Sequence, residues 1–132
     1  PNEPLVMVMN ANNICGKKSD TIKLSELKDQ PLIIPLRWKS NFIAACQKLN
    51  FEPNIICVSD SIVQDLLMVK NNLGLAMIPF SGKKLLSDGD LIYKRIDPEI
   101  TTHTVLAWRK NQTLSTACKN FIELFKELFI KG

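Results

Sequence analysis

The chain has 132 residues, of which 45% are hydrophobic, and 17 Lys and Arg residues against 13 Asp and Glu residues give a net charge of +4. This length predicts one domain or two small lobes with a true hydrophobic core. The basic residues occur singly or in pairs such as Lys17-Lys18 and Lys83-Lys84, which is typical of a solvated surface. A nucleic-acid-binding face within the chain is therefore disfavoured, since such a face needs a concentrated basic stripe with interleaved aromatic residues.

The cysteines and the single histidine disfavour metal chemistry. No CxxC pair occurs among Cys15, Cys46, Cys57 and Cys118, and His103 is the only histidine, so we expect no metal and no cofactor. Unpaired cysteines in apolar segments behave as small hydrophobes and favour a reducing compartment. No signal peptide precedes Pro1, and the apolar runs are shorter than the roughly twenty residues that span a bilayer. We therefore expect a cytoplasmic protein with no membrane partner.

The first part of the chain predicts a strand, a turn and a short helix. Residues Pro4–Met9 form a continuous apolar run, and the polar stretch Asn10–Asn13 follows it as a turn. Ser25 is a plausible N-cap for a short helix over Glu26–Asp29.

The next segment predicts a strand-helix-strand unit. Leu32–Leu36 is an apolar strand, Arg37–Ser40 a polar loop, and Ile55–Val58 a further strand. The helix between them is indicated by apolar residues at helical spacing, namely Phe42, Ile43, Ala45, Cys46 and Leu49.

Residues 59–79, SDSIVQDLLMVKNNLGLAMIP, predict a helix, a turn and a buried strand. Ser59 or Asp60 is expected to cap the helix, and Asn71, Asn72 and Gly74 to end it, because Asn and Gly tolerate left-handed backbone. The unbroken apolar run Leu75–Ile78 is typical of a parallel strand that helices cover on both faces. With right-handed crossovers, the strands from Leu32 to Ile78 are expected to be parallel, which indicates an α/β fold.

The last third of the chain predicts two strands and one long helix. The strands are expected at Leu91–Ile96 and Thr102–Trp108, and Thr113 is a candidate cap for the final helix. That helix carries a wide apolar face that includes Phe121, Phe125 and Phe129. Such a face either packs on the same domain or belongs against something that the chain lacks.

Four stretches of the sequence, in this order, resemble the C-terminal part of the effector-binding domain of LysR-type transcriptional regulators. PLVMVMNANNICGKK with IKLSELKDQPLII resembles a crossing strand, its turn, a short helix and the next strand. SDSIVQDLLMVKNNLGLAMIP resembles the family's helix and its glycine-containing signature, with Asn72 where Gly or Ala is usual. DLIYKRIDPEITTHTVLAWRK and LSTACKNFIELFKEL resemble its last strands and its terminal helix.

This resemblance implies a periplasmic-binding-protein-like fold of type 2, in which two α/β lobes with parallel-rich sheets and helices on both faces are joined by crossing strands. Residues 1–10 would be a crossing strand, residues 15–96 the second lobe, and residues 102–132 the return strand and C-terminal helix of a partial first lobe. The N-terminal helix-turn-helix of the family is absent from this sequence, so DNA would be bound only through that missing part.

Three groups of residues are candidate effector contacts. Ligands of α/β folds bind at the carboxyl ends of parallel strands, where helix N-termini favour anions. This rule selects Arg37, Trp38 and Ser40, which are suited to a carboxylate-bearing ligand. It also selects Ser59, Asp60 and Ser61, although the Asp60 carboxylate repels an anion. The resemblance adds Met9 and Asn10 at the end of the crossing strand.

Each group also has a plain structural interpretation. Arg37 is equally well explained as a solvated residue and Trp38 as the cover of a lobe edge. Residues 59–61 also fit ordinary helix capping. Asn10 fits a turn, and a structural role is favoured for His103.

The leading hypothesis is an effector-sensing domain of a LysR-type bacterial regulator, in which a small molecule bound in an interlobe cleft modulates a DNA-bound oligomer. The alternatives are a periplasmic-type solute-binding protein and a small α/β enzyme. An enzyme is disfavoured because no nucleophile elbow, phosphate loop, HExxH or GxGxxG motif is present. We expect a homodimer or a higher homo-oligomer to form through Phe121, Phe125 and Phe129.

Overall fold

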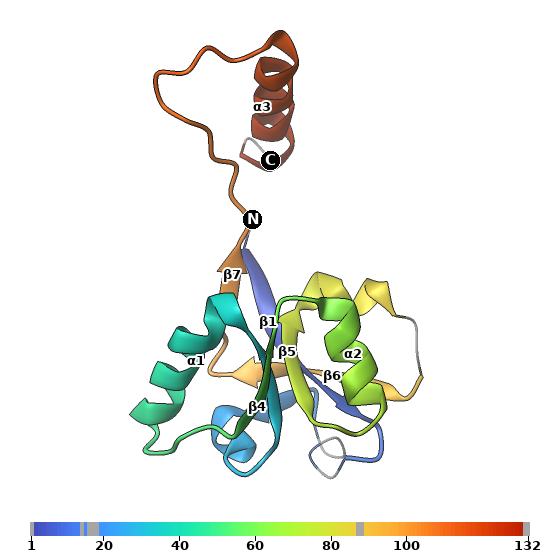
Figure 1. The fold of residues 1–132 in the computed structure, drawn as a ribbon. Coiled ribbons are helices and arrows are strands. Elements are labelled where there is room, and N and C mark those ends of the chain that lie inside the picture. Colours follow the sequence, from blue (N-terminus) through green and yellow to red (C-terminus); the bar gives the residue numbers. More distant parts are fainter. Residues whose placement is uncertain (1, 14, 16–18, 87–88, 131–132) are drawn as a thin grey trace. The chain divides into compact units, whose positions relative to one another are not determined.

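The structure, a computed structural model, describes residues 2–13, 15, 19–86 and 89–130. The chain divides into two compact units. The main unit is Glu3–Thr102, and the small unit combines the first two residues with His103–Gly132. Figure 1 labels the three α-helices and several of the strands.

The sheet of the main unit is built around β1 and three parallel strands. Within the described residues, seven strands form one sheet in the order β2-β6-β1-β5-β3-β4, with β7 paired to β1. Its strands are β1 (Asn2–Asn10), β2 (Thr21–Lys23), β3 (Leu32–Pro35), β4 (Ile55–Ser59), β5 (Leu75–Pro79), β6 (Leu91–Asp97) and β7 (Thr101–His103).

Strand pairing confirms the predicted parallel unit. Strand β3 pairs in parallel with both β4 and β5, whereas β1 is antiparallel to β5 and β6. All of Leu75–Ile78 in β5 is buried, as its unbroken apolar composition predicts. Edge strand β4 alternates instead, with Ile56 and Val58 exposed.

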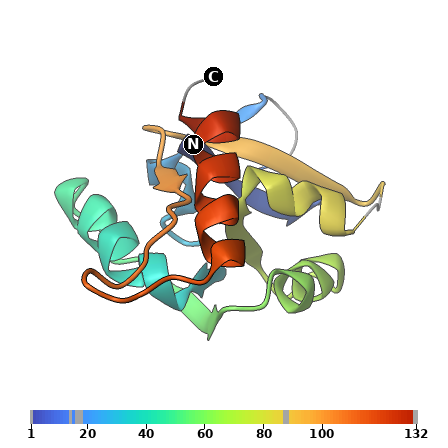
Figure 2. The ribbon, with the colours of Figure 1, turned by 90° about the horizontal axis from the view of Figure 1, so that it is seen from above.

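Helices α1 (Leu36–Lys48) and α2 (Ile62–Lys70) cover opposite faces of the sheet. Phe42 and Cys46 of α1 pack with Leu32 and Met77 on one face. Leu66 and Val69 of α2 pack with the opposite side chains of the same strands. Figure 2 shows the two helices on either side of the strands. This two-layered cover is what the fold class predicts, because parallel sheets require helices on both faces.

Several predicted element boundaries are wrong. Residues Arg37–Ser40 are not a loop but the first turns of α1, which follows Pro35 directly. The short helix is a 3-10 helix, η2 (Leu24–Leu27), with Lys23 N donating to Glu26 Oε2 at 2.7 Å, so Ser25 is not its cap. The N-cap of α2 is Ser61, whose Oγ accepts from Gln64 N, and neither Ser59 nor Asp60.

The end of the chain also differs from expectation. Strand β7 stops at His103, and residues 104–109 have no regular structure, because they find no partner strand within the described residues. The last helix, α3 (Thr116–Phe129), is capped by Ser115, whose Oγ accepts from Cys118 N at 3.2 Å, and not by Thr113. A further 3-10 helix, η3 (Phe80–Leu85), follows β5.

Candidate functional site

A small hollow lies where the three parallel strands of the main unit end. Its volume is about 70 Å³. The lining combines the ends of β3, β4 and β5 with the starts of α1 and α2: Pro35, Arg37, Trp38, Asp60, Ile62, Asp65 and Pro79. We call it the strand-end hollow. Its position is the one at which α/β folds bind ligands.

Arg37 and Trp38 reach this hollow from the first turn of α1. The Arg37 guanidinium carbon lies 5.3 Å from the centroid of the Trp38 ring, which is within the range of a cation–π contact. Arg37 is exposed, while Trp38 is half-buried and packs against the core on the α1 face. Trp38 therefore covers the lobe edge and lines the hollow at once. Ser40 is exposed further along the helix and is not one of the lining residues.

Residues 59–61 form the start of α2. Ser59 Oγ accepts from Ser61 N at 3.1 Å, and Ser61 Oγ accepts from Gln64 N at 3.4 Å. Both hydroxyls thus satisfy N–H groups that a helix start leaves free. Of the three predicted residues, Asp60 lines the hollow, whereas Ser59 and Ser61 act beside it as turn and cap.

Asp65 is a lining residue that the pattern of the sequence did not single out. It is 1% exposed, and its Oδ1 atom has no hydrogen-bond partner within the described structure. Burial raises the pKa of its carboxyl, a hydrogen bond with the Ser59 side chain opposes this, and the charge of Asp60 adds to it. An unsatisfied buried group of this kind costs about 1–3 kcal/mol. The sequence contains a signal for this residue, which is an acidic side chain at a core position of a helix. The spacing of the core positions is given by Ile62, Asp65, Leu66 and Val69.

Met9 and Asn10 do not join the other predicted contacts. Strand β1 is antiparallel to β5, and its register pairs Leu5 with Pro79 and Val8 with Ala76. The end of β1 therefore lies at the opposite end of the sheet from Pro79. There Met9 is fully buried, and Asn10 Nδ2 donates to the Lys70 carbonyl at 3.1 Å. The expectation that these two residues share a site with Arg37 and Asp60 is corrected by this register.

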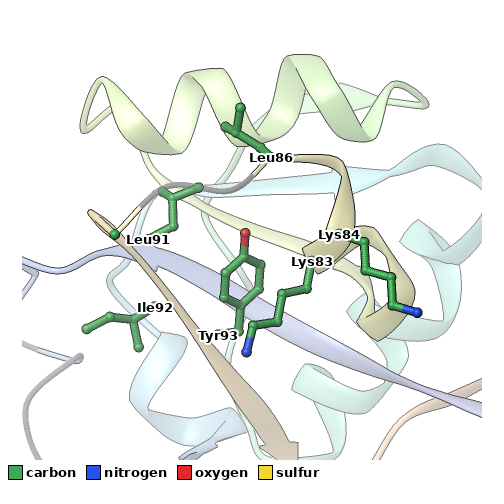
Figure 3. Close-up of a pocket in the computed structure, with 7 residues that line it drawn as sticks. Lys83, Lys84, Leu86, Leu91, Ile92 and Tyr93 are labelled. Carbon is green, nitrogen blue, oxygen red and sulfur yellow. The ribbon is translucent and has the colours of Figure 1, made fainter.

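A second, broader depression of about 780 Å³ lies between η3 and the start of β6. Figure 3 shows Lys83 beside the ring of Tyr93, while Lys84 turns away from it. The Lys83 ammonium is 5.5 Å from the centroid of that ring. Both lysines are exposed, and the described residues that line the depression include no acidic or histidine side chain. Its described lining shares no residue with the strand-end hollow.

In the small unit, α3 exposes much of its apolar face. Phe121 and Phe129 are 57% and 52% exposed, and the Phe125 and Phe129 rings lie 4.9 Å apart. An apolar hollow of about 340 Å³ continues this face, with Trp108, Cys118 and Phe121 in its lining. Only Ile122 of this helix is buried.

The remaining candidates from the sequence are His103, possible metal sites and possible membrane-spanning helices. His103 Nδ1 lies 2.6 Å from Asn2 Oδ1. The described residues contain no group of three or more His, Cys, Asp or Glu side chains placed to hold a metal ion. None of the described helices is both long and apolar enough to cross a membrane.

Comparison with known proteins identifies the family and two relatives. A family model of the LysR substrate binding domain matches residues 1–130. The uncharacterized HTH-type transcriptional regulator YwbI of Bacillus subtilis (strain 168) is 27% identical over 128 residues, 92% of this chain and 41% of its own. The HTH-type transcriptional regulator BsdA of the same organism is 27% identical over 131 residues, 92% of this chain and 44% of its own. The chain therefore spans less than half the length of these two relatives.

Solved structures agree with this assignment. The effector binding domain of QuiR in complex with shikimate has a TM-score of 0.82 at 23% identity, covering 98% of this chain and 63% of that chain. HinK, a LysR family transcriptional regulator from Pseudomonas aeruginosa, has a TM-score of 0.76 at 17% identity, covering 96% of this chain and 46% of that chain. The α/β fold of the LysR effector-binding domains, which is periplasmic-binding-protein-like, is thereby confirmed. Because the family model covers almost the whole sequence, the chain belongs to the LysR substrate binding domain family.

Proposed function

We propose that this chain is the effector-sensing part of a LysR-type transcriptional regulator and binds its small-molecule effector at the strand-end hollow. One observation carries the proposal: three parallel strand ends and two helix starts surround a single hollow. Its lining includes Arg37, Trp38, Asp60 and Asp65. Small-molecule sites are concave and combine apolar walls with a few convergent polar groups. Arg37 supplies a guanidinium for an effector carboxylate, and Trp38 an aromatic plate beside it.

In a longer regulator, a second lobe would close over these strand ends and form an interlobe cleft. The effector would then bind one arrangement of lobes or subunits better than another and shift the population toward it. DNA would be contacted by the N-terminal helix-turn-helix part that such relatives carry, and not by this chain. We propose a cytoplasmic location, in keeping with this function.

Binding at the hollow is tested by thermal shift and isotope-edited NMR of this chain. Shikimate, the ligand of the QuiR structure, is the first probe, followed by a panel of small carboxylic acids. A binding compound is expected to perturb amide signals of residues 36–39 and 60–65, and Arg37→Ala is expected to weaken binding about tenfold, equivalent to 1.4 kcal/mol. Lys83→Ala, in the depression of Figure 3, is the matched control and should leave binding unchanged. Perturbations confined to that depression would contradict the proposal.

We further propose that copies of this chain associate through the exposed face of α3, which contains Phe121, Phe125 and Phe129. Large exposed apolar faces mark interaction surfaces, since water disfavours their exposure. We expect affinities in the micromolar range for a small apolar interface, so sedimentation at about 100 μM should give a dimer or a larger species. Phe121→Ser removes part of the apolar face and should shift the species toward monomer. Val63→Ser on the exposed surface of α2 is the control. A monomer at that concentration would mean that something other than a second copy covers this face.

A further inference from the structure

Asp65 sets the chemical character of the strand-end hollow. It occupies a core position of α2, is almost completely buried and is one of the residues that line the hollow. Its Oδ1 atom has no hydrogen-bond partner in the described structure. Buried polar atoms of folded proteins nearly always have partners, so an exception calls for an explanation. Because Asp65 lines the hollow, a ligand bound there that carries a hydrogen-bond donor would explain the exception.

The charges around the hollow show which donor fits. Asp60 and Asp65 contribute two carboxyl groups and Arg37 one guanidinium, so the lining is acidic on the α2 side and basic on the α1 side. The start of α2 favours negative charge, but its two Asp side chains already supply it. A plain anion placed there would meet like charges, whereas a cation would be attracted. Burial by itself disfavours the charged form of Asp65, and a cation in the hollow would offset this by stabilising the carboxylate.

The size of the hollow limits what enters it. A volume of about 70 Å³ is small beside the roughly 300–1,000 Å³ of pockets that enclose a whole drug-sized ligand. An amino group with one attached carbon fits such a space, and the rest of a ligand would lie outside it. The Arg37 guanidinium, exposed at the rim, remains available for a carboxylate.

We propose that the effector is a zwitterion of the amino-acid class, whose ammonium group donates to Asp65 in the strand-end hollow and whose carboxylate is held by Arg37. This inference rests on the proposed function, since it names the ligand class of the same site. It also predicts discrimination: an analogue with the amino group removed leaves Asp65 without a partner, and a hydroxyl analogue offers a donor without the charge.

The test uses the 132-residue chain and matched compounds. The twenty common amino acids are screened by NMR at about 10 mM, well above the millimolar Kd expected for a ligand with few contacts. Each amino acid that binds is compared with the hydroxy acid and the unsubstituted acid of the same carbon skeleton. The amino acid should bind at least about tenfold more tightly than either analogue, which corresponds to 1.4 kcal/mol.

Asp65→Asn keeps the shape of the side chain and removes its charge. This variant should lose about tenfold in affinity for the amino acid and bind the amino acid and its two analogues equally, and the conservative Asp65→Glu variant should retain part of the preference. Asp29→Asn, at an exposed position, is the control. Analogues that lack nitrogen but bind equally well at residues 36–39 and 60–65 would overturn the amino-acid assignment and leave the proposed function standing. An absence of perturbation by any amino acid overturns the assignment too, and perturbations by every compound elsewhere on the chain overturn both proposals.

Discussion

The carbonyl oxygen of Pro31 lies 2.6 Å from the point at which a Cβ atom on Gly74 would stand. The same oxygen accepts a hydrogen bond from Leu75 N at 2.8 Å. The turn after α2 is thus joined directly to the start of β3, and only a residue without a side chain permits this approach. Gly74 has no positive φ angle, so it is required here for space and not for left-handed backbone.

We expect Gly74→Ala to lower the free energy of unfolding by about 1–3 kcal/mol, the usual cost of forcing atoms into packed structure. Urea denaturation followed by circular dichroism measures this. Gly89→Ala is the matched control, because a Cβ at that position would meet no atom within 4 Å among the described residues other than its chain neighbours. Equal stability of the two variants would show that the backbone at residue 74 moves without cost.

Asp65→Asn is expected to stabilise the protein at neutral pH. Burial raises the pKa of this carboxyl above its ordinary value of 3.8. The native chain is therefore most stable, as far as this carboxyl is concerned, below the pKa of the unfolded chain, where Asp65 is protonated. This contribution is lost as the pH rises through the higher pKa of the folded state. The variant does not titrate at this position, so its stability advantage over the native chain should be larger at pH 7 than at pH 4. Urea midpoints at the two pH values measure the difference, and a variant that is less stable than the native chain at both would contradict it.

Cys46 should resist thiol reagents in the folded protein. Burial, helped by the negative charge of Glu52, raises the pKa of its thiol from 9.0 to about 11. At pH 8 only about one such thiol in a thousand is the reactive thiolate. Cys118 is exposed and should react in the native state. Mass spectrometry after brief alkylation should find Cys118 modified and Cys46 modified only in denaturant; rapid labelling of Cys46 without denaturant would refute its burial.

Phe42→Ala should cost about 3–5 kcal/mol, because it leaves a cavity between α1 and the sheet. The Phe42 side chain is 1% exposed, within the core on that face. Phe80, at the start of η3, is 46% exposed and provides the matched control, for which we expect less than about 1 kcal/mol. Thermal unfolding of both variants gives the comparison, and similar losses would contradict the assigned core.

Local patterns predicted most of the main unit correctly. The apolar run in β5 and the apolar stripe of α2 each require burial on a particular face, so the parallel β3-β4-β5 unit follows from composition and spacing. The same patterns predicted the boundaries of helices and strands less well. Pro35 and Pro79 both precede helical turns, and the polar residues after Pro35 have no feature that separates a loop from the first turn of a helix.

Asp65 and Asn10 show where sequence reasoning reaches its limit. A strand-end rule located Arg37 and Asp60, since helix starts and strand ends are visible in the chain. The antiparallel pairing of β1 was not visible, and it carries Asn10 to the far end of the sheet. Asp65 lies within the helix predicted in residues 59–79, and the burial that leaves its Oδ1 atom without a partner arises only in the folded chain.

The sequence by itself determined the α/β class, the parallel core and the likeness to LysR effector-binding domains, because periodicity and chain order are local properties. Only the tertiary structure decided which candidate residues meet, because strand direction and register depend on contacts between segments far apart in the chain. Arg37, Asp60 and Asp65 come together for that reason, and Met9 and Asn10 are separated from them by the same pairing.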